Sequence, residues 1–335
     1  MFNLKVIGID LGTANTIIYV KGVGIALREP SVVAVDAKTK RVMSVGNEAK
    51  MMLGKTPGSI IAMRPLKDGV IAEFDITAKM LNHYFKKVAG STIFSRPRVV
   101  VCIPYGVTEV EKRAVEEVTL EAGAQSVALV EEPVAAAFGS GLRVDDIHGS
   151  MIVDIGGGTT EVAVLSMGGI VLSNSLRIAG DELDYAIRDY IKRVYGVLIG
   201  DTTAETLKKQ IGSAHYTIDR GVVDVRGRNV LTGLPAVQPI NTLDLLRAMN
   251  DELNHIIGNI KQTLEATPPE LASDIYETGI MLAGGSALLA GLDRLVYENT
   301  QIRTFVAKNP IDSVALGIGK IIENDAHGII NYRAR

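Results

Sequence analysis

The sequence predicts an α/β protein whose two related halves share one cleft. The first observation is a repeated pattern in residues 6–20 and 151–165: an apolar run, an aspartate, a turn of Gly and Thr, and a second apolar run. The second is that short apolar runs alternate with stretches of helical spacing, as in βαβ units. The third is the absence of a low-complexity linker, which favours a shared cleft over independent domains. A duplicated α/β unit gives such a cleft one hairpin and one carboxylate from each half.

Composition narrows the class of protein. The chain has 335 residues, enough for two domains of ordinary size, with 47% apolar residues and a mean hydropathy of +0.22. The apolar surplus indicates surface that is buried against subunits or a membrane. A net charge of −3 without a long basic run argues against nucleic acid as a partner. No apolar run reaches the ~18 residues of a spanning helix, and no room for a signal peptide precedes the first strand. We therefore expect an intracellular protein whose membrane contact is peripheral.

Cysteine and histidine usage points the same way. The single cysteine, Cys102, lies inside an apolar run and is predicted to be a buried small hydrophobe rather than a nucleophile. One cysteine excludes a disulfide within the chain, which suits the cytosol. The five histidines have no ligand spacing, which argues against a zinc site.

The turn at the centre of the chain is predicted to cradle phosphate. Asp154 ends an apolar run, and Gly156, Gly157 and Gly158 follow before Thr159. Glycines let backbone N–H groups approach an anion, and a carboxylate at the strand end can hold the metal that accompanies polyphosphate. For this stretch alone, an ordinary Gly-rich hairpin is the alternative.

An N-terminal copy of the pattern favours the phosphate cradle. Asp10 ends the first apolar run, and Gly12, Thr13 and Asn15 lie in the turn that follows it. Asp10 and Asp154 are separated by a little less than half of the chain, which is the spacing of a duplicated unit. Two such hairpins can face one another across a single site.

The remaining elements of the first half follow from periodicity and capping. Apolar residues from Ile76 onward have helical spacing, and Thr108 is the expected N-cap of another helix. The expected elements are short strands within 24–45, a minor subdomain at 46–64, a helix at 76–89, a strand at 99–103, a helix at 108–123 and a strand at 126–130.

The loop before the strand at 99–103 has two interpretations. Ile93 and Phe94 lie among small polar residues, with Lys87 and Arg96 nearby. An exposed apolar pair beside cations is suited to shallow insertion into an anionic leaflet. Alternatively, the two side chains plug the core below the loop.

The second half contains a partner for a helix of the first. Residues 133–141 and 312–322 are both rich in small residues, so we expect two helices that cross closely at a hinge. Pro133 suits the first turn of the earlier one. The other expected elements are helices at 180–195, 203–211 and 242–264, strands at 222–231 and 237–241, and a strand from 280 that runs into a Gly-rich turn and a helix.

Six motifs together resemble the actin, Hsp70 and sugar-kinase superfamily, and within it the MreB family of bacterial actins. They are residues 10–16 (DLGTANT), 131–133 (EEP), 154–161 (DIGGGTTE), 177–181 (RIAGD), 267–271 (TPPEL) and 283–286 (AGGS). Each motif is weak alone, whereas the combination is specific and spans essentially the whole chain.

The resemblance implies an actin-like fold with a cleft for ATP or ADP and Mg²⁺. Domain I is expected at residues 1–145 and 312–335, with a small subdomain near 33–65. Domain II is expected at 146–311, with a small subdomain near 181–242.

The resemblance also assigns roles to residues at the phosphates. Asp10 and Asp154 are expected to orient Mg²⁺ through water, and Glu132 to position or activate the attacking water with the help of Thr159. Glu131 is the adjacent alternative to Glu132. The residues expected to wrap the phosphates are Gly12, Thr13, Asn15, Gly156, Gly157 and Gly158.

A second group of residues is expected around the nucleoside. Glu205 and Lys208 lie one helical turn apart and match the adenine-side contacts. Gly284, Gly285 and Ser286 are expected to pass close to the nucleoside. The turn at 283–286 departs from the usual Thr-Gly-Gly-Gly of the family, which is expected to change these contacts slightly.

By resemblance, the protein is a cytoskeletal ATPase that forms paired filaments and directs cell shape. It is expected in the cytoplasm, peripherally on the inner face of the cell membrane, with cell-shape and wall-synthesis proteins as partners. Ile93 and Phe94 match the membrane-inserting pair of the family. The amphipathic N-terminal helix of some relatives is absent, so this loop, with Phe2, is expected to carry the attachment. A small-molecule kinase and a chaperone-type ATPase of the same superfamily are the alternatives, although neither a base for a sugar hydroxyl nor a substrate-binding domain is found.

Overall fold

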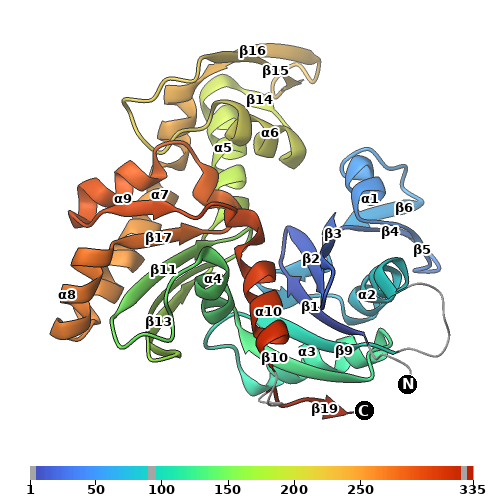
Figure 1. Ribbon diagram of the computed structural model, residues 1–335. Helices are drawn as coiled ribbons and strands as arrows, with labels where there is room; N and C mark the ends of the chain where they lie inside the picture. The colour runs from blue at the N-terminus through green and yellow to red at the C-terminus, as the bar shows by residue number, and fades with distance from the viewer. Residues whose placement is uncertain (1–4, 90–95, 326–329, 335) are drawn as a thin grey trace.

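The computed structural model describes residues 5–89, 96–325 and 330–334. These residues form two large mixed sheets that lie side by side (Figure 1). The first sheet has the order β19-β10-β9-β1-β2-β3 and the second the order β13-β12-β11-β17-β18. The strands of the first are β1 (Val6–Leu11), β2 (Asn15–Val20), β3 (Gly24–Pro30), β9 (Arg98–Ile103), β10 (Ser126–Glu131) and β19 (Arg333–Ala334). Those of the second are β11 (Ser150–Ile155), β12 (Thr160–Ser166), β13 (Gly169–Leu176), β17 (Ile280–Ala283) and β18 (Thr304–Val306).

The two sheets repeat one local arrangement. Strand β1 pairs with β2 in antiparallel and with β9 in parallel orientation, and β11 pairs in the same two ways with β12 and β17. Both hairpins predicted from the repeated sequence pattern are therefore confirmed. Every residue of β11 is buried, as expected for a central strand with both faces covered.

The helices cover the faces of these sheets. Thr108 caps α3 as predicted, because its hydroxyl accepts from the N–H of Glu111 while the Glu111 carboxylate accepts from the N–H of Thr108. The helices are α2 (Phe74–Ala89), α3 (Glu109–Glu121), α4 (Glu132–Ser140), α5 (Gly180–Tyr195), α6 (Asp201–Ile211), α7 (Thr242–Ala266), α8 (Pro269–Thr278), α9 (Leu292–Thr300) and α10 (Ser313–Asn324).

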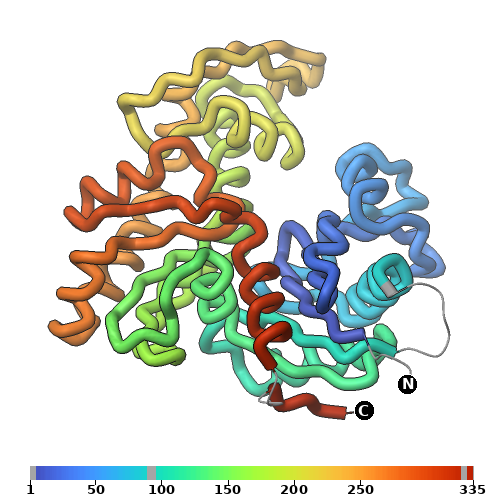
Figure 2. Tube along the Cα trace, in the orientation of Figure 1, coloured from blue at the N-terminus to red at the C-terminus, as the bar shows by residue number. Residues whose placement is uncertain are grey.

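Two smaller units stand beside the large sheets, one at the right of Figure 2 and one at its top. One contains β4 (Val33–Asp36), β5 (Val42–Val45), β6 (Ile60–Met63) and α1 (Asn47–Met52), followed by the hairpin of β7 (Leu66–Lys67) and β8 (Val70–Ile71). The other contains β14 (Val197–Leu198), β15 (Val222–Asn229) and β16 (Pro235–Asn241), with α6. The residue limits given above for the domains and subdomains stay a prediction.

Helices α4 and α10 cross between the two sheets (Figure 1). Their contact depends on glycine: a Cβ at Gly139 would lie 1.7 Å from the carbonyl oxygen of Ser313, and one at Gly317 would lie 1.7 Å from that of Ala135. Close contact between the two small-residue helices is thus confirmed, and a hinge at the crossing stays a prediction. The buried cluster around them takes Val100 from β9 and Ile152 from β11, so one core joins the halves.

A few expected boundaries were wrong. Helix α6 begins at Asp201 rather than at residue 203, and β16 begins at Pro235 rather than at residue 237. The segment after β17 is a 3₁₀ helix, η1 (Gly285–Leu288), because Gly284 adopts a φ of +81° and turns the chain sharply. Cys102 is buried, as predicted.

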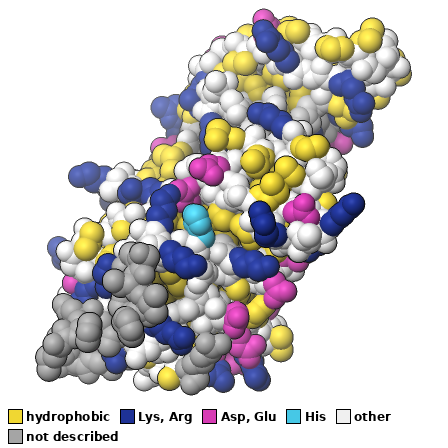
Figure 3. All heavy atoms as spheres, turned by 90° about the vertical axis from the view of Figure 1, so that its right-hand side faces the viewer, with side chains coloured by type: hydrophobic (Ala, Val, Ile, Leu, Met, Phe, Trp, Pro, Cys, Tyr) yellow, Lys and Arg dark blue, Asp and Glu magenta, His cyan; other side chains and the backbone are white. Residues whose placement is uncertain are grey.

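Membrane contact was predicted for residues that lie outside the described part. These residues are Phe2, Ile93 and Phe94, and all three lie outside the described ranges. Figure 3 shows the face of the molecule at the right-hand side of Figure 1, where Lys and Arg side chains are interspersed with hydrophobic ones. Among the described residues, no helix has the length and apolar character needed to cross a membrane.

Candidate functional site

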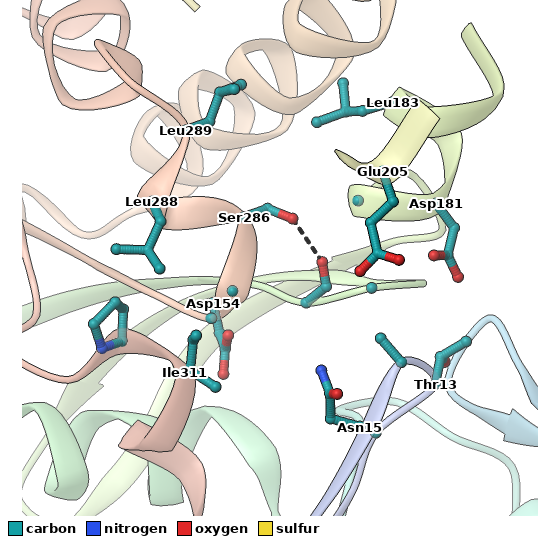
Figure 4. Close-up of a pocket in the computed structure, with 18 of the residues that line it drawn as sticks. Thr13, Asn15, Asp154, Asp181, Leu183, Glu205, Ser286, Leu288, Leu289 and Ile311 are labelled. Carbon is teal, nitrogen blue, oxygen red and sulfur yellow. Dashed lines mark hydrogen bonds between the residues drawn. The ribbon is translucent and has the colours of Figure 1, made fainter. Parts of the chain in front are cut away.

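A cavity of about 500 Å³ lies where the two hairpins approach one another. Both hairpins, the first turns of α4 and α5, helix α6 and the loop after β17 contribute to its walls (Figure 4). The predicted site residues among its lining are Asp10, Gly12, Thr13, Asn15, Glu132, Asp154, Gly156, Gly157, Glu205, Lys208, Gly284, Gly285 and Ser286. Residues from both halves of the sequence therefore meet in one place.

The N-terminal hairpin forms one wall. Its turn is closed by the N–H of Gly12, which donates to the carbonyl of Asn15 at 3.1 Å. A Cβ at Gly12 would lie 2.8 Å from that carbonyl oxygen, so the turn has no room for a side chain here. The hydroxyl of Thr13 accepts from the N–H of Gly69 at 3.0 Å, which ties this turn to the turn between β7 and β8. Figure 4 shows Asn15 on this hairpin, opposite Asp154.

The central hairpin forms the facing wall. The N–H of Gly156 donates to the carbonyl of Thr159 at 2.9 Å and closes the turn. A Cβ at Gly157 would lie 2.8 Å from the Cβ of Ala14, so the two turns are in near contact. This close approach requires a residue without a side chain.

Two predicted residues lie behind that turn. Gly158 and Thr159 are described by the structure but do not line the cavity. Gly158 packs against Thr13 and Asp68, and Thr159 is buried against Gly69. The tight turn directs both residues toward β7 and β8. Neither Gly158 nor Thr159 therefore faces the cavity.

Three carboxylates line the floor of the cavity. Burial, with the negative charge of Asp10, raises the pKa of Asp154 to about 8. Burial, with the charge of Asp312, raises the pKa of Asp10 to about 7. Burial raises the pKa of Glu132 well above its usual value, with further contributions from Asp154, Asp10 and Glu161.

This cluster fits a divalent cation. Asp154 is 2% exposed, and its Oδ2 has no hydrogen-bond partner among the described residues. A cation would satisfy that oxygen and offset the repulsion between Asp154 and Asp10. No set of three or more His, Cys, Asp or Glu side chains in the described ranges forms a metal site. The two predicted ligands, Asp10 and Asp154, would leave most of the coordination sphere of an ion to water, which Mg²⁺ favours.

The structure separates the two neighbouring glutamates. Glu132 begins α4, with Pro133 in the first turn, and lines the cavity. Glu131 ends β10 and is not among the described residues that line it. The position immediately before the proline is thus the one at the cavity.

Glu205 and Lys208 line the cavity from α6 but are already paired. Burial alone would raise the pKa of Glu205, but hydrogen bonds from Lys209 and Lys50 outweigh it and lower the pKa to about 2. The ammonium of Lys208 donates to the carbonyl of Gly180 at 2.6 Å and pairs with Asp184 at 2.9 Å. Both side chains therefore stabilise the wall that they form.

Two ion pairs cross the mouth of the cavity. Lys50 of α1 lies 3.0 Å from Glu205 of α6, and Arg64 lies 2.6 Å from Asp181 at the start of α5. Each joins the first small unit to an element of the second half. Sequence reasoning missed these pairs, because the partners are more than a hundred positions apart and belong to no motif.

The loop after β17 closes the site. A Cβ at Gly284 would lie 2.4 Å from Asp154 Oδ1 and 2.3 Å from the carbonyl oxygen of Ile155. The hydroxyl of Ser286 donates to the carbonyl of Gly156 at 2.9 Å (Figure 4). An apolar part of the cavity wall lies beside this loop. Sequence reasoning missed it, because its residues look like ordinary hydrophobic core residues in the sequence. It is formed by Leu183, Leu288, Leu289, Ile311 and Val314.

The fold and the site define an actin-like protein: two α/β halves of common design, each offering a Gly-rich hairpin and an aspartate to the cleft between them. Comparison with known proteins agrees. The family model described as MreB/Mbl protein matches residues 4–328. The chain belongs to the MreB/Mbl family, and is thus an actin-like cell-shape protein.

Individual relatives match over nearly their whole length. The cell shape-determining protein MreB of Escherichia coli (strain K12) is 52% identical over 328 residues, covering 96% of this chain and 94% of that protein. The cell shape-determining protein Mbl of Bacillus subtilis (strain 168) is 46% identical over 318 residues, covering 95% and 96%. The crystal structure of MreB 5 of Spiroplasma citri bound to AMPPNP has a TM-score of 0.92 at 37% identity, covering 98% and 100%. A MamK double helical filament, at 21% identity and a TM-score of 0.80, shares the fold.

Proposed function

We propose that the protein binds ATP and ADP with Mg²⁺ in this cavity, hydrolyses ATP, and assembles into paired filaments on the membrane. The observation that carries the proposal is the pairing of two Gly-rich turns, with the half-buried Asp10 and the buried Asp154, across a cavity of about 500 Å³. That volume suits a ligand of nucleotide size. In support, MreB 5 of Spiroplasma citri has been crystallised with AMPPNP and with ADP.

The two turns would hold the phosphates. Gly12, Thr13 and Asn15 would approach them from one side, and Gly156 and Gly157 from the other. The N–H groups of Gly12 and Gly156 close their own turns, so the N–H of Gly157, which has no acceptor among the described residues, would be a donor to phosphate. Gly158 and Thr159 would act from behind, by holding the second turn in place. Thr159 is thus proposed as an assisting residue that acts through the turn.

The nucleoside would occupy the opposite end. Gly284 packs against Asp154 and Ile155, whereas a Cβ at Gly285 would meet no atom closer than 4.0 Å, which leaves room for a close approach there. The apolar wall beside this loop suits the face of a planar base. Glu205 and Lys208 would form the adenine side of the wall. Ribose hydroxyls could share the Glu205 carboxylate with its lysine partners.

Hydrolysis would depend on Glu132. A carboxylate at this place can accept a hydrogen bond from a water molecule and align it with the γ-phosphorus. Asp10 and Asp154 would hold Mg²⁺ through its water shell, and the ion, when bound, neutralises charge on the phosphate oxygens. The pKa of Glu132 lies well above its usual value because of burial and of Asp154 and Asp10, so its ionisation is sensitive to charge in the cavity.

Filament formation and membrane attachment complete the proposal. The relatives are named for cell shape, and a fold relative forms a double helical filament. Ile93 and Phe94 would insert into the inner leaflet of the cell membrane. The protein would thus be cytoplasmic and peripheral, with cell-shape and wall-synthesis proteins as partners.

Sedimentation with ATP and liposomes tests the proposal against its alternatives. A filament-forming ATPase pellets with ATP and co-sediments with liposomes of anionic lipid. A small-molecule kinase or a chaperone-type ATPase would stay in the supernatant under both conditions while still binding ATP. If the protein binds ATP but stays in the supernatant, the proposal that it forms filaments is overturned, while the proposal that it binds nucleotide stands.

A further inference from the structure

The hydroxyl of Ser286 joins the loop after β17 to the turn between β11 and β12. It donates to the carbonyl of Gly156 at 2.9 Å, as the dashed line in Figure 4 shows. The same carbonyl accepts from the N–H of Gly180, at the start of α5, at 3.2 Å. Two donors from different elements therefore fix the orientation of one peptide group.

That peptide group also contains the N–H of Gly157. In a trans peptide the C=O of one residue and the N–H of the next point in opposite directions. With its carbonyl end held at Ser286, the peptide directs the N–H of Gly157 away from Ser286. Gly157 lines the cavity beside Ala14 of the facing hairpin, and its N–H has no acceptor among the described residues. A free donor is thus held in place before any ligand is present.

The surroundings leave this arrangement little freedom. A Cβ at Gly180 would lie 2.8 Å from the Ser286 hydroxyl and 3.1 Å from the Gly156 carbonyl oxygen, so the three residues are packed together. Lys208 fixes Gly180 in turn, by donating to its carbonyl at 2.6 Å. The tether therefore links the turn to a wall that is already rigid.

We infer that Ser286 is a positioning residue, which holds the turn at Gly156 and Gly157 ready for a polyphosphate anion, rather than a residue that recognises the nucleoside. The inference rests on the proposed nucleotide site. Ordering the turn in advance lowers the entropic cost of binding, and only ligands that carry phosphate gain from it.

Removal of the hydroxyl gives the test. Ser286→Ala deletes the donor with little change of shape, whereas Ser286→Thr retains it. Loss of one neutral hydrogen bond should weaken binding of ADP and of pyrophosphate by about fivefold. Affinity for adenosine should stay unchanged, and Ser286→Thr should restore the affinity for both phosphate ligands. All are measured by displacement of a fluorescent ADP analogue from the full chain.

A matched control lies on the same hairpin, at the far end from the cavity. Ser166 also donates its hydroxyl to a backbone carbonyl, that of Ile147, at 2.8 Å. Ser166→Ala should leave the affinity for ADP, pyrophosphate and adenosine unchanged.

Each other outcome is decisive. Equal losses for adenosine and pyrophosphate in Ser286→Ala, or an unchanged ADP affinity, would overturn the inference. If Ser286→Ala loses heat stability along with all binding, Ser286→Gly is measured in its place, and an unchanged ratio of pyrophosphate to adenosine affinity counts against the inference. Failure of the wild-type protein to bind ADP or pyrophosphate would instead refute the proposed nucleotide site.

Discussion

Asp10, Glu132 and Asp154 share one cavity, and none of them is paired with a cation among the described residues. Burying like charges together raises their pKa values and makes the ligand-free site costly to ionise. The clustering of three carboxylates is explained if a bound cation and a phosphate-containing ligand complete the site. Sequence reasoning reached Asp10 and Asp154 because an aspartate at the end of an apolar strand, repeated in both halves, is visible without the structure. Glu132 was reached only through the resemblance of residues 131–133 to the family motif.

The first prediction at this scale concerns pH. The pKa of Asp154 is about 8 in the folded protein, against 3.8 for an aspartate carboxyl exposed to water. The folded state therefore holds the proton more tightly. The stabilisation that this provides is complete below about pH 4 and is lost as the pH rises to about 8. Asp154→Asn does not ionise, so without nucleotide and with EDTA its melting temperature should exceed that of the wild type increasingly from pH 5 to pH 8.

Differential scanning fluorimetry across this range measures the effect. We expect a gain of about 2 °C or more at pH 8, on the order of 1 kcal/mol. The exposed Asp251→Asn is the control and should show no such trend. A difference between Asp154→Asn and the wild type that is independent of pH would contradict the account.

Glu132→Ala should separate turnover from binding. If Glu132 aligns the attacking water, its loss should slow ATP hydrolysis by about 10²-fold or more while ATP still binds. Phosphate release and calorimetric titration give the two quantities. Glu131→Ala serves as the matched control, and turnover at the wild-type rate in Glu132→Ala would remove the assignment.

At the scale of elements, the crossing of α4 and α10 joins the halves. Gly317→Ala places a methyl group 1.7 Å from the carbonyl oxygen of Ala135, which is too close for both atoms, so the helices must separate. We expect a loss of about 1–3 kcal/mol in the free energy of unfolding, measured by urea denaturation. Gly258→Ala in α7 is the control, because a Cβ there meets nothing within 4 Å and should stabilise the helix slightly. Equal stability of the two variants would contradict the proposed packing.

The elements also show how far the sequence leads. Most strands and helices were predicted, because hydrophobic periodicity and residues such as Thr108 and Pro133 act locally. A helix was predicted after the Gly-rich turn at 284–285, but its 3₁₀ type was not, because it follows a sharp turn at Gly284 with a φ of +81° that the sequence pattern does not specify. The apolar wall and the pairs Lys50–Glu205 and Arg64–Asp181 could not be predicted, since they form only when distant segments meet.

For the whole molecule, membrane attachment is the main prediction. Replacing Ile93 and Phe94 together with Ser should release the protein from anionic liposomes, because insertion depends on their apolar side chains. ATP binding should persist, because none of the described residues that line the cavity comes from α2 or β9, the elements on either side of this loop. Co-sedimentation at the wild-type level would instead favour a core role for the pair.

The central claim is that a nucleotide lies between the two hairpins, where Gly157 approaches Ala14. Calorimetric titration of the wild-type chain and of Gly157→Ala with ATP and Mg²⁺ tests it most directly. A methyl group at this position would lie 2.8 Å from the Cβ of Ala14 and would force the two turns apart. We predict saturable binding at one site in the wild type, weakened at least about tenfold in the variant, which equals about 1.4 kcal/mol. The same affinity in both proteins would place the nucleotide outside the two hairpins and contradict the account.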